Sequence, residues 1–350
     1  MVSTGDATSS CKVVLAGGVA KKLLEEISEG LKQLGKPPLL VGFLANQDPA
    51  ARMYADWTGR TCKENMGKAR AKVLTRYLSG FRFELREVDR EELEEHILAA
   101  NQDNQVDGII VYYPIFGSRQ DQYLQQITDV TKDVEGLSHR YIFNMYQNVR
   151  FLDEQKMQKS VLPCTPLAVI KILEHLQLYN TILPYGNRLF GRSITVINRS
   201  EVVGRPLAAL LANDGASVYS VDVTGVQQFT RGEGIKNKRH EVLERPNWSL
   251  EDCLPLSDIV ISGVPGDSFK VPTRLLREGA VCINFSSEKN FGPEVKQKAS
   301  IYVPAIGKVT IVVLLRNLLR IVQNRKSSDV TPAAAVEKSG TVEEAAPPGR

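Results

Sequence analysis

The chain has 350 residues, of which 43% are hydrophobic and 24% are charged, and this composition excludes intrinsic disorder over most of its length. At roughly 150 residues per domain, the length predicts two domains. The net charge is only +4, and the basic segment at 68–76 accounts for it, so we expect no nucleic-acid binding. No apolar run reaches the roughly 18 residues of a membrane-spanning helix, so we expect no membrane insertion.

The cysteines and the chain ends indicate the compartment. Five widely spaced cysteines without a C-x-x-C pair, and only four histidines, predict neither a zinc site nor a disulfide framework. Free thiols suit a reducing compartment. The first residues carry no secretory signal and little arginine, and the last carry no peroxisomal or lipidation signal. We therefore expect a cytoplasmic protein without a bound metal.

The first half of the chain alternates between helical and strand patterns after a frayed start at residues 1–10. Helices are predicted over 19–34, from 50 onward and over 90–100, and strands over 39–44, 81–88 and 108–113. This alternation is typical of an α/β domain with a parallel sheet.

A second α/β pattern follows a helix over 165–178, in which Thr165 is expected as the cap and Pro166 at the first position. Its apolar strands are predicted over 193–198, 217–221, 258–262 and 281–285. A strongly apolar helix is predicted over 309–322. Residues 326–350 have the composition of a disordered tail.

A nucleotide-binding βαβ unit is predicted over residues 194–222. A strand enters a polar turn, a helix begins near Val203, and a second strand ends at Asp222. Such a turn places backbone N–H groups and a helix N-terminus where a pyrophosphate would lie. Gly204 is the single glycine of the turn, so the usual G-x-G-x-x-G pattern is absent and the turn alone does not identify the ligand.

Asp222 bears on the choice of nucleotide. It lies 22 residues after Ser200, where a carboxylate can accept both ribose hydroxyls and would repel a 2′-phosphate, which favours NAD over NADP. Two alternatives stay open. Asp222 could merely cap a turn, and the guanidinium of Arg199 could hold a 2′-phosphate.

Five stretches occur in the order that one enzyme family shows. They are DPAARMY at 48–54, DGIIVYYP at 107–114, KDVEG at 132–136, PCTP at 163–166 and RSEVVGRP at 199–206. Over roughly residues 10–325 the chain resembles the methylenetetrahydrofolate dehydrogenase/cyclohydrolase family, and most of all its fungal, monofunctional, NAD-dependent branch. One departure is a segment between Gly67 and Gly80 that is about a dozen residues longer than the family's junction.

The resemblance implies two α/β domains with a cleft between them, the second domain being a Rossmann-type parallel sheet that binds NAD. Residues 1–164 would form the folate-binding catalytic domain, completed by the C-terminal helix 309–325, and residues 165–308 the NAD-binding domain. A tetrahydrofolate derivative, expected to be polyglutamylated, would lie in the cleft against the nicotinamide. Members of the family are typically homodimers.

The resemblance also implies roles on the folate side. Tyr54 matches the tyrosine of the family's Y-x-x-x-K motif, whose ring stacks near the folate, although a tyrosine on a helix could simply pack. Thr58 stands where bifunctional members carry lysine, and it shares a helix face with Tyr54. Because threonine supplies no amine, cyclohydrolase activity is expected to be lost and dehydrogenase activity to be retained.

Other folate-side positions depart from the family pattern. Tyr112 replaces a glutamine, and Glu135 replaces an aspartate but keeps a carboxylate for the N–H donors of the pterin. Asp133, from the motif of Glu135, and Pro304 and Gly307, from a later loop, are carried over as substrate-binding residues.

Two residues are candidate catalytic groups, Tyr54 and Cys164. Cys164 begins a helix whose N-terminus could lower the thiol pKa. The alternative is a small buried packing residue, and hydride transfer needs no nucleophile. The expected cofactor-binding residues are Arg199, Ser200, Gly204, Arg205, Pro206, Asp222, Val223, Gly263, Val264 and Pro265.

The resemblance therefore implies NAD-dependent oxidation of 5,10-methylenetetrahydrofolate to the 5,10-methenyl form by direct hydride transfer, in one-carbon metabolism and purine synthesis. Two alternatives are a bifunctional, NADP-dependent dehydrogenase/cyclohydrolase and a catalytically inert NAD-binding regulatory protein.

Overall fold

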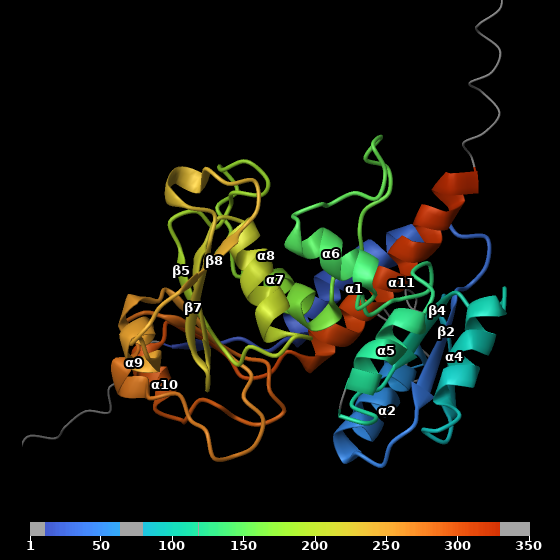
Figure 1. Ribbon diagram of the computed structural model, residues 1–350, viewed down its shortest axis with the longest axis horizontal. Helices are drawn as coiled ribbons and strands as arrows, with labels where there is room; N and C mark the ends of the chain where they lie inside the picture. Colours follow the sequence, from blue (N-terminus) through green and yellow to red (C-terminus); the bar gives the residue numbers. More distant parts are fainter. Residues whose placement is uncertain (1–10, 64–79, 118, 330–350) are drawn as a thin grey trace, which may run out of the picture.

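Two sheets with helices around them make up the protein in the computed structural model, which describes residues 11–63, 80–117 and 119–329. An eight-stranded sheet and a three-stranded sheet lie on either side of a long C-terminal helix (Figure 1). The frayed start at 1–10, the basic segment and insertion between 67 and 80, and the tail from 330 onward lie outside the described residues, apart from Gly80 itself.

The smaller sheet has the order β3-β2-β4 and is parallel throughout. Its strands are β2 (Leu39–Leu44), β3 (Arg82–Glu87) and β4 (Gly108–Val111), and the helices that connect or flank them are α2 (Pro49–Lys63), α4 (Leu93–Gln102) and α5 (Arg119–Ile127). Successive side chains of β2 point to opposite faces, so Leu40 joins one apolar cluster while Val41 and Phe43 join another. Burial on both faces explains its continuous apolar sequence.

The larger sheet has the order β1-β11-β10-β9-β5-β6-β7-β8. Its strands are β1 (Lys12–Val13), β5 (Ser193–Ile197), β6 (Ser217–Asp222), β7 (Gly225–Thr230), β8 (Glu241–Glu244), β9 (Ile259–Ser262), β10 (Val281–Asn284) and β11 (Ile301–Val303). The neighbouring strands from β1 through β11, β10, β9 and β5 to β6 are all parallel. Strands β7 and β8 then extend the sheet with antiparallel pairing.

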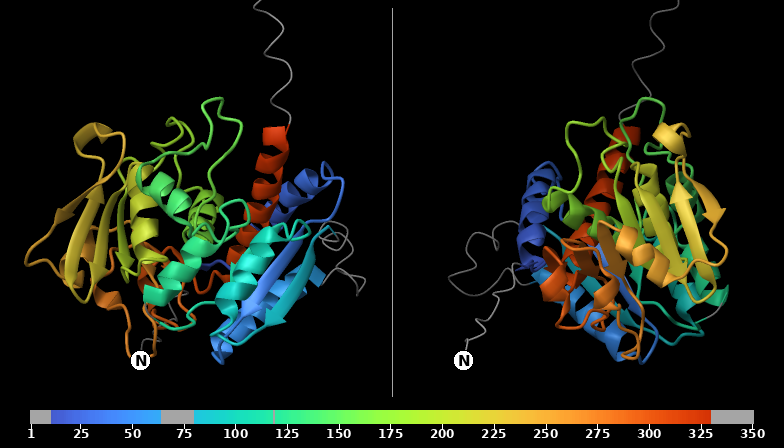
Figure 2. Two further views of the ribbon diagram at one scale, coloured as in Figure 1. Left: turned by 45° about the vertical axis from the view of Figure 1, so that its right-hand side comes forward. Right: turned by 90° about the vertical axis from the view of Figure 1, so that its left-hand side faces the viewer.

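Helices join the two sheets into one body with a shared core. The remaining α-helices are α1 (Gly17–Leu31), α6 (His139–Tyr146), α7 (Cys164–His175), α8 (Gly204–Asn213), α9 (Leu250–Cys253), α10 (Val295–Lys298) and α11 (Gly307–Asp329). Helix α11 packs against α1 and α7, and Arg316 on α11 pairs with Glu26 on α1 at 2.7 Å. Figure 2 shows α11 next to the blue α1 and above the smaller sheet. In the described residues, no helix combines the length and the apolar character that crossing a membrane requires.

The α/β class with a largely parallel sheet is confirmed, and several details differ from expectation. Strand β1 pairs with β11 of the larger sheet, although the sequence places everything before 165 in the first domain. Helix α7 begins at Cys164, with Pro163 as its N-cap, so Thr165 is not the cap and Pro166 is not at the first position. Helix α11 extends to Asp329, so the predicted tail is helical over its first residues. The boundary near residue 165 itself stays a prediction.

Candidate functional site

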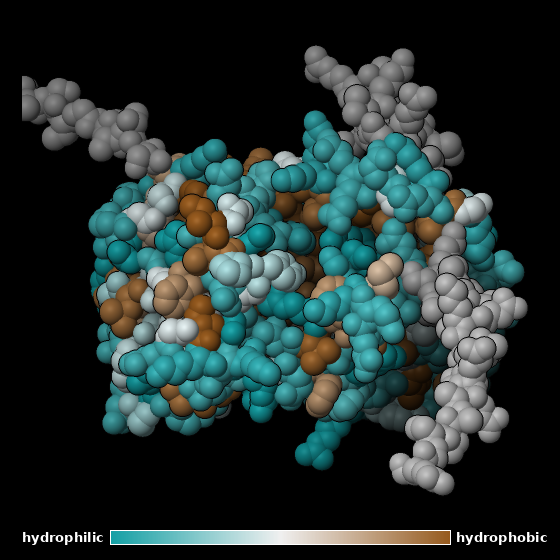
Figure 3. Space-filling view, turned by 90° about the horizontal axis from the view of Figure 1, so that it is seen from above, coloured by the Kyte–Doolittle hydropathy of each residue, from teal (hydrophilic) through white to brown (hydrophobic). Residues whose placement is uncertain are grey.

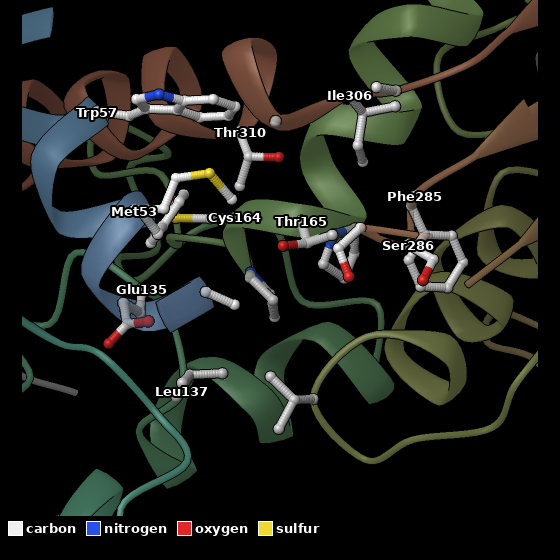
Figure 4. A pocket seen from close by; sticks show the side chains of 18 residues that line it. Met53, Trp57, Glu135, Leu137, Cys164, Thr165, Phe285, Ser286, Ile306 and Thr310 are labelled. Atoms are coloured by element: carbon white, nitrogen blue, oxygen red, sulfur yellow. The ribbon is translucent and has the colours of Figure 1, made fainter. Parts of the chain in front are cut away.

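A cavity of about 390 Å³ lies between the smaller sheet and the larger one. Figure 4 shows its side chains converging from α2, from the loop between α5 and α6, from the start of α7, from the loop after β10 and from the start of α11. The lining residues are Ala50, Met53, Tyr54, Trp57, Glu135, Leu137, Pro163, Cys164, Thr165, Pro166, Val202, Phe285, Ser286, Ser287, Ala305, Ile306, Gly307 and Thr310.

One face of helix α2 forms a wall of the cavity. Ala50, Met53, Tyr54 and Trp57 recur at intervals of three and four residues, which places them on the same side of a helix. Tyr54 lines the cavity as expected. Met53 and Trp57 were missed, although Trp57 lies three residues after Tyr54 and Met53 lies four residues before Trp57, a spacing that could have revealed both.

Tyr112 and Thr58 lie behind Tyr54 rather than on the cavity wall. The rings of Tyr54 and Tyr112 meet edge to face, with their centroids 5.7 Å apart. Thr58 is fully buried, and its hydroxyl donates a hydrogen bond of 2.9 Å to the carbonyl of Tyr54. Although Thr58 shares a helix face with Tyr54, it does not reach the cavity, and Thr58 and Tyr112 instead support the tyrosine.

The two carboxylates of the KDVEG loop, Asp133 and Glu135, have different roles. Asp133 accepts backbone N–H groups of Glu135 at 3.1 Å, Gly136 at 2.9 Å and Ser138 at 2.7 Å, and it does not line the cavity. The geometry therefore does not support the predicted substrate-binding role of Asp133, whose carboxylate instead fixes the backbone of the loop.

Glu135 of the same loop does line the cavity, and it accepts the N–H of Val111 at 3.1 Å. Burial raises the pKa of Glu135 to about 8, and the charge of Asp133 adds to this rise. The carboxyl group is thus a polar group in an apolar wall, placed to meet hydrogen-bond donors.

Cys164 lies on the cavity wall, but its thiol is not activated. Its Sγ is 3.3 Å from the carbonyl of Val134 and 3.4 Å from the side-chain nitrogen of Asn317. Burial raises the pKa of the Cys164 thiol well above its usual value, and the charges of nearby carboxylates add to the rise. The lowered pKa expected from the helix N-terminus is therefore wrong, and a catalytic role for Cys164 stays a prediction without support from this geometry.

The opposite wall is built where strands of the larger sheet end. Phe285 and Ser286 follow β10, and a Cβ on Gly263 would lie 1.8 Å from the Phe285 ring. Only glycine at 263 allows this ring to cover the end of β9. Ser286 donates to the carbonyl of Val264 at 3.0 Å, so the loops after β9 and β10 are held together.

Of the two residues predicted here, Gly307, which begins α11, lines the cavity, and Pro304, which precedes the helix, does not. The carbonyl of Pro304 accepts a hydrogen bond of 3.2 Å from the side chain of Asn284. Phe285 and Ser286 were missed, yet their place after a parallel strand is the usual place for ligand contacts.

The turn between β5 and α8 forms a backbone cradle. A Cβ on Gly204 would lie 1.7 Å from the carbonyl oxygen of Asn198, so helix α8 approaches the strand more closely than any other residue permits. Ser200 accepts the N–H of Gly204 at 3.3 Å. A glycine-dependent turn at the start of a ten-residue helix fits the pyrophosphate of a dinucleotide.

Asp222 and Arg199 meet at the edge of this cradle. The carboxylate of Asp222 accepts the backbone N–H of Arg199 at 2.6 Å and that of Val223 at 2.7 Å. Asp222 therefore does cap the turn. Each carboxylate oxygen keeps capacity for a further donor such as a ribose hydroxyl. The guanidinium of Arg199 donates to the carbonyls of Ser220 at 2.8 Å and Gly225 at 2.6 Å. Since these bonds occupy it, the geometry favours NAD over a 2′-phosphorylated nucleotide.

The other predicted cofactor residues border the same edge. Arg205 pairs with Glu201 at 3.3 Å, and Pro206 is buried in the first turn of α8. Val223 is fully exposed at the tip of the β6–β7 hairpin, and Pro265 is exposed after β9. Their contacts with a nucleotide stay predictions.

Comparisons with known proteins agree with this geometry. The description "Tetrahydrofolate dehydrogenase/cyclohydrolase, catalytic domain" matches residues 14–135, and the NAD(P)-binding domain of the same family matches residues 163–235. A methylenetetrahydrofolate dehydrogenase [NAD(+)] of Schizosaccharomyces pombe is 56% identical over 313 residues, which cover 89% of this chain and 93% of that protein. A protein of the same name from Dictyostelium discoideum is 42% identical, with 89% and 94% covered.

A solved structure gives the same result. The NAD-dependent 5,10-methylenetetrahydrofolate dehydrogenase of Saccharomyces cerevisiae superimposes with a TM-score of 0.83 at 52% identity, covering 91% of this chain and 99% of that one. The two-domain fold and its nucleotide-binding second part are thereby confirmed. The chain belongs to the tetrahydrofolate dehydrogenase/cyclohydrolase family.

Proposed function

We propose that the chain oxidises 5,10-methylenetetrahydrofolate to 5,10-methenyltetrahydrofolate by direct hydride transfer to NAD, and that it lacks cyclohydrolase activity. Its oxidoreductase class and its use of NAD follow from relatives that carry this activity in their names. The observation that carries the proposal is the cavity itself. It brings Tyr54 and Glu135 opposite Phe285 and Ser286, at the edge of the sheet that presents the nucleotide cradle.

Hydride transfer requires little from the side chains other than positioning the substrate. When the methylene bridge loses hydride, the lone pairs of two nitrogens stabilise the resulting cation, and no proton has to be removed. Bound NAD supplies the hydride acceptor. The walls formed by Met53, Trp57 and Ile306 would exclude water and position the methylene bridge against the bound nucleotide.

Glu135 orients the folate in this scheme. Its carboxylate accepts the N–H donors of the pterin, while the N–H of Val111 fixes one of its oxygens. Tyr54 presents its ring to the cavity and is held from behind by Tyr112 and Thr58. The substrate is thus oriented by one polar group and one aromatic face.

The cavity offers little for the hydrolysis of the methenyl product. Attack by water needs general acid–base assistance. Among the described residues that line the cavity there is no lysine, arginine or histidine. Thr58, at the position of the family's lysine, is buried and bonded to the backbone. Glu135, the one carboxyl group among these lining residues, is engaged with the pterin in this scheme, so the methenyl form is released rather than hydrolysed.

The proposal extends to the cellular setting. We place the enzyme in the cytosol, in one-carbon metabolism that supplies purine synthesis, acting as a homodimer on polyglutamylated folate. The relatives' names support a folate substrate, and none of the five cysteines, all of which lie in the described residues, forms a disulfide bond, which suits a reducing compartment. A bifunctional NADP enzyme is disfavoured by Arg199 and Thr58, and an inert protein by the intact cavity.

An absorbance assay tests the proposal. Purified protein is given methylenetetrahydrofolate with NAD or NADP, and the reduced nucleotide and the methenyl product are followed together. We expect equal accumulation of both with NAD alone. Turnover with NADP without accumulation of methenyl would establish the bifunctional alternative, and a folded protein without turnover would establish the inert one.

A further inference from the structure

A second cavity, also of about 390 Å³, lies on the face that carries the loops after α6 and α7. Arg150 and Lys159 belong to the first loop, and Tyr185 and Arg188 to the second. Figure 3 looks onto this side and shows a hollow near the middle of the face, bordered by hydrophilic residues. We name this cavity the rear cavity, because no residue lines both it and the candidate active site.

The rear cavity concentrates positive charge. Its lining includes six cationic side chains, Arg150, Lys159, Lys171, Arg188, Arg316 and Arg320, against two acidic ones, Glu174 and Asp214. The whole chain carries a formal net charge of only +4, so a similar surplus is gathered in one small space. Glu26, which pairs with Arg316 from α1, neutralises one further charge.

Some of these cations are already engaged. Arg150 pairs with Asp214 at 2.7 Å, and Lys171 pairs with Glu174 at the same distance. Each pair contains one positive and one negative group, so it leaves the surplus unchanged. Because Arg316 is paired with Glu26, the positive charges without an acidic partner are those of Lys159, Arg188 and Arg320.

Arg320 is the least satisfied member. It is half-buried on α11, and within the described part of the chain it forms no hydrogen bond or ion pair. Burial lowers the pKa of its guanidinium, and the like charge of Arg316 lowers it further, more than Glu26 offsets. Its guanidinium is not among the buried polar groups that lack a partner in the described residues, so it is open to solvent and can be reached by an anion.

We propose that the rear cavity binds a small molecule carrying several phosphate or carboxylate groups. Arg320 would bind one acid group from α11, and Lys159 and Arg188 would bind others from the two loops. Tyr185 is pre-positioned beside them, with the Arg150 guanidinium 4.8 Å and the Arg188 guanidinium 5.7 Å from its ring. The site differs from the nucleotide cradle in its place and in its use of side chains rather than backbone.

The rear cavity shares its framework with the candidate active site. Helix α7 lines the active-site cavity with Cys164 and the rear cavity with Lys171. Asn317 lines the rear cavity and contacts Cys164 Sγ at 3.4 Å. Asn317 therefore connects the wall of the rear cavity, where the anion would bind, to Cys164 on the wall of the active-site cavity.

Calorimetry on the full chain tests the proposal. Sodium tripolyphosphate is titrated into protein that is already saturated with NAD, so that the nucleotide cradle is filled. We expect saturable binding that weakens at higher salt. Arg320→Gln and Lys159→Gln are each expected to weaken binding at least tenfold. Arg90→Gln, which removes an exposed cation of the smaller domain paired with Glu91, is the matched control and should bind like the wild type.

A tri-γ-glutamate peptide in the second arm separates the two sources of negative charge. Binding of tripolyphosphate alone identifies a phosphate ligand, and binding of the peptide alone identifies a carboxylate ligand. If neither binds, or if Arg320→Gln binds as tightly as Arg90→Gln, the proposal is overturned. Lys159 is exposed, so its variant is expected to fold even if the Arg320 variant does not.

Discussion

Replacing Glu135 by glutamine should remove a pH dependence from folate binding. The pKa of Glu135 is raised to about 8 by burial. Such a group is about one-tenth ionised at pH 7 and about nine-tenths ionised at pH 9. If the carboxylate is the form that accepts the pterin N–H groups, the KM for folate should fall about tenfold from pH 7 to pH 9.

The variant Glu135→Gln cannot ionise, so its KM should be higher than that of the wild type at pH 9 and nearly flat across this range. Initial rates at saturating NAD measure both profiles, and Glu135→Asp, which keeps a carboxylate, is the matched control. A wild-type KM that does not change with pH, or an equal slope in Glu135→Gln, would refute the role of this carboxyl group.

The same substitution has an independent signature in the stability of the ligand-free protein. Because the folded pKa lies above the unfolded value of 4.5, the folded state holds a proton that the unfolded state has lost between about pH 4.5 and 8. The contribution of Glu135 to the free energy of unfolding therefore falls as pH rises through this window. Urea titrations should show this decline in the wild type relative to Glu135→Gln.

Three further predictions concern the cradle and the cavity wall. Gly204→Ala forces a Cβ into the carbonyl of Asn198 and should raise the KM for NAD at least tenfold, at a cost of about 1–3 kcal/mol in unfolding free energy by urea titration; an unchanged KM would show that the turn does not hold the nucleotide. Asp222→Ser should lower the NAD to NADP ratio of kcat/KM at least tenfold, and an unaltered ratio would contradict ribose recognition by this carboxylate. Cys164→Ala should keep kcat within about twofold while destabilising the fold by about 1 kcal/mol, whereas a kcat loss of a hundredfold in a folded variant would establish a catalytic thiol.

The sequence predicts the parts of this molecule whose order is fixed by local patterns. The apolar run at Leu39–Leu44 and the helix at Gly204–Asn213 follow from their periodicity and turn residues. Tyr54 reaches the cavity because a helix face determines where it points, and Glu135 reaches it from the short loop between α5 and α6.

The parts that were missed depend on contacts distant in the chain. Strand β8 is exposed along its length and charged at both ends, so its sequence resembles a loop, and it becomes a strand by pairing with β7. Asp133 and Glu135 look alike in sequence, and only the folded loop separates the carboxylate that binds backbone from the one that faces the cavity. The direction of the Cys164 pKa shift was likewise decided by burial, which a helix start does not reveal.

The pairing of β1 with β11 has a consequence for dividing the protein. A fragment of residues 165–308 would contain β11 but not Lys12–Val13, so the backbone donors and acceptors along one side of β11 would be exposed. Such an open edge is a template for pairing with other chains, and we expect the fragment to self-associate. A nucleotide-binding fragment that folds on its own therefore has to include Lys12–Val13 from the N-terminal part of the chain. Truncations that start after Val13 should fail for the same reason, although they leave every residue of both cavities in place.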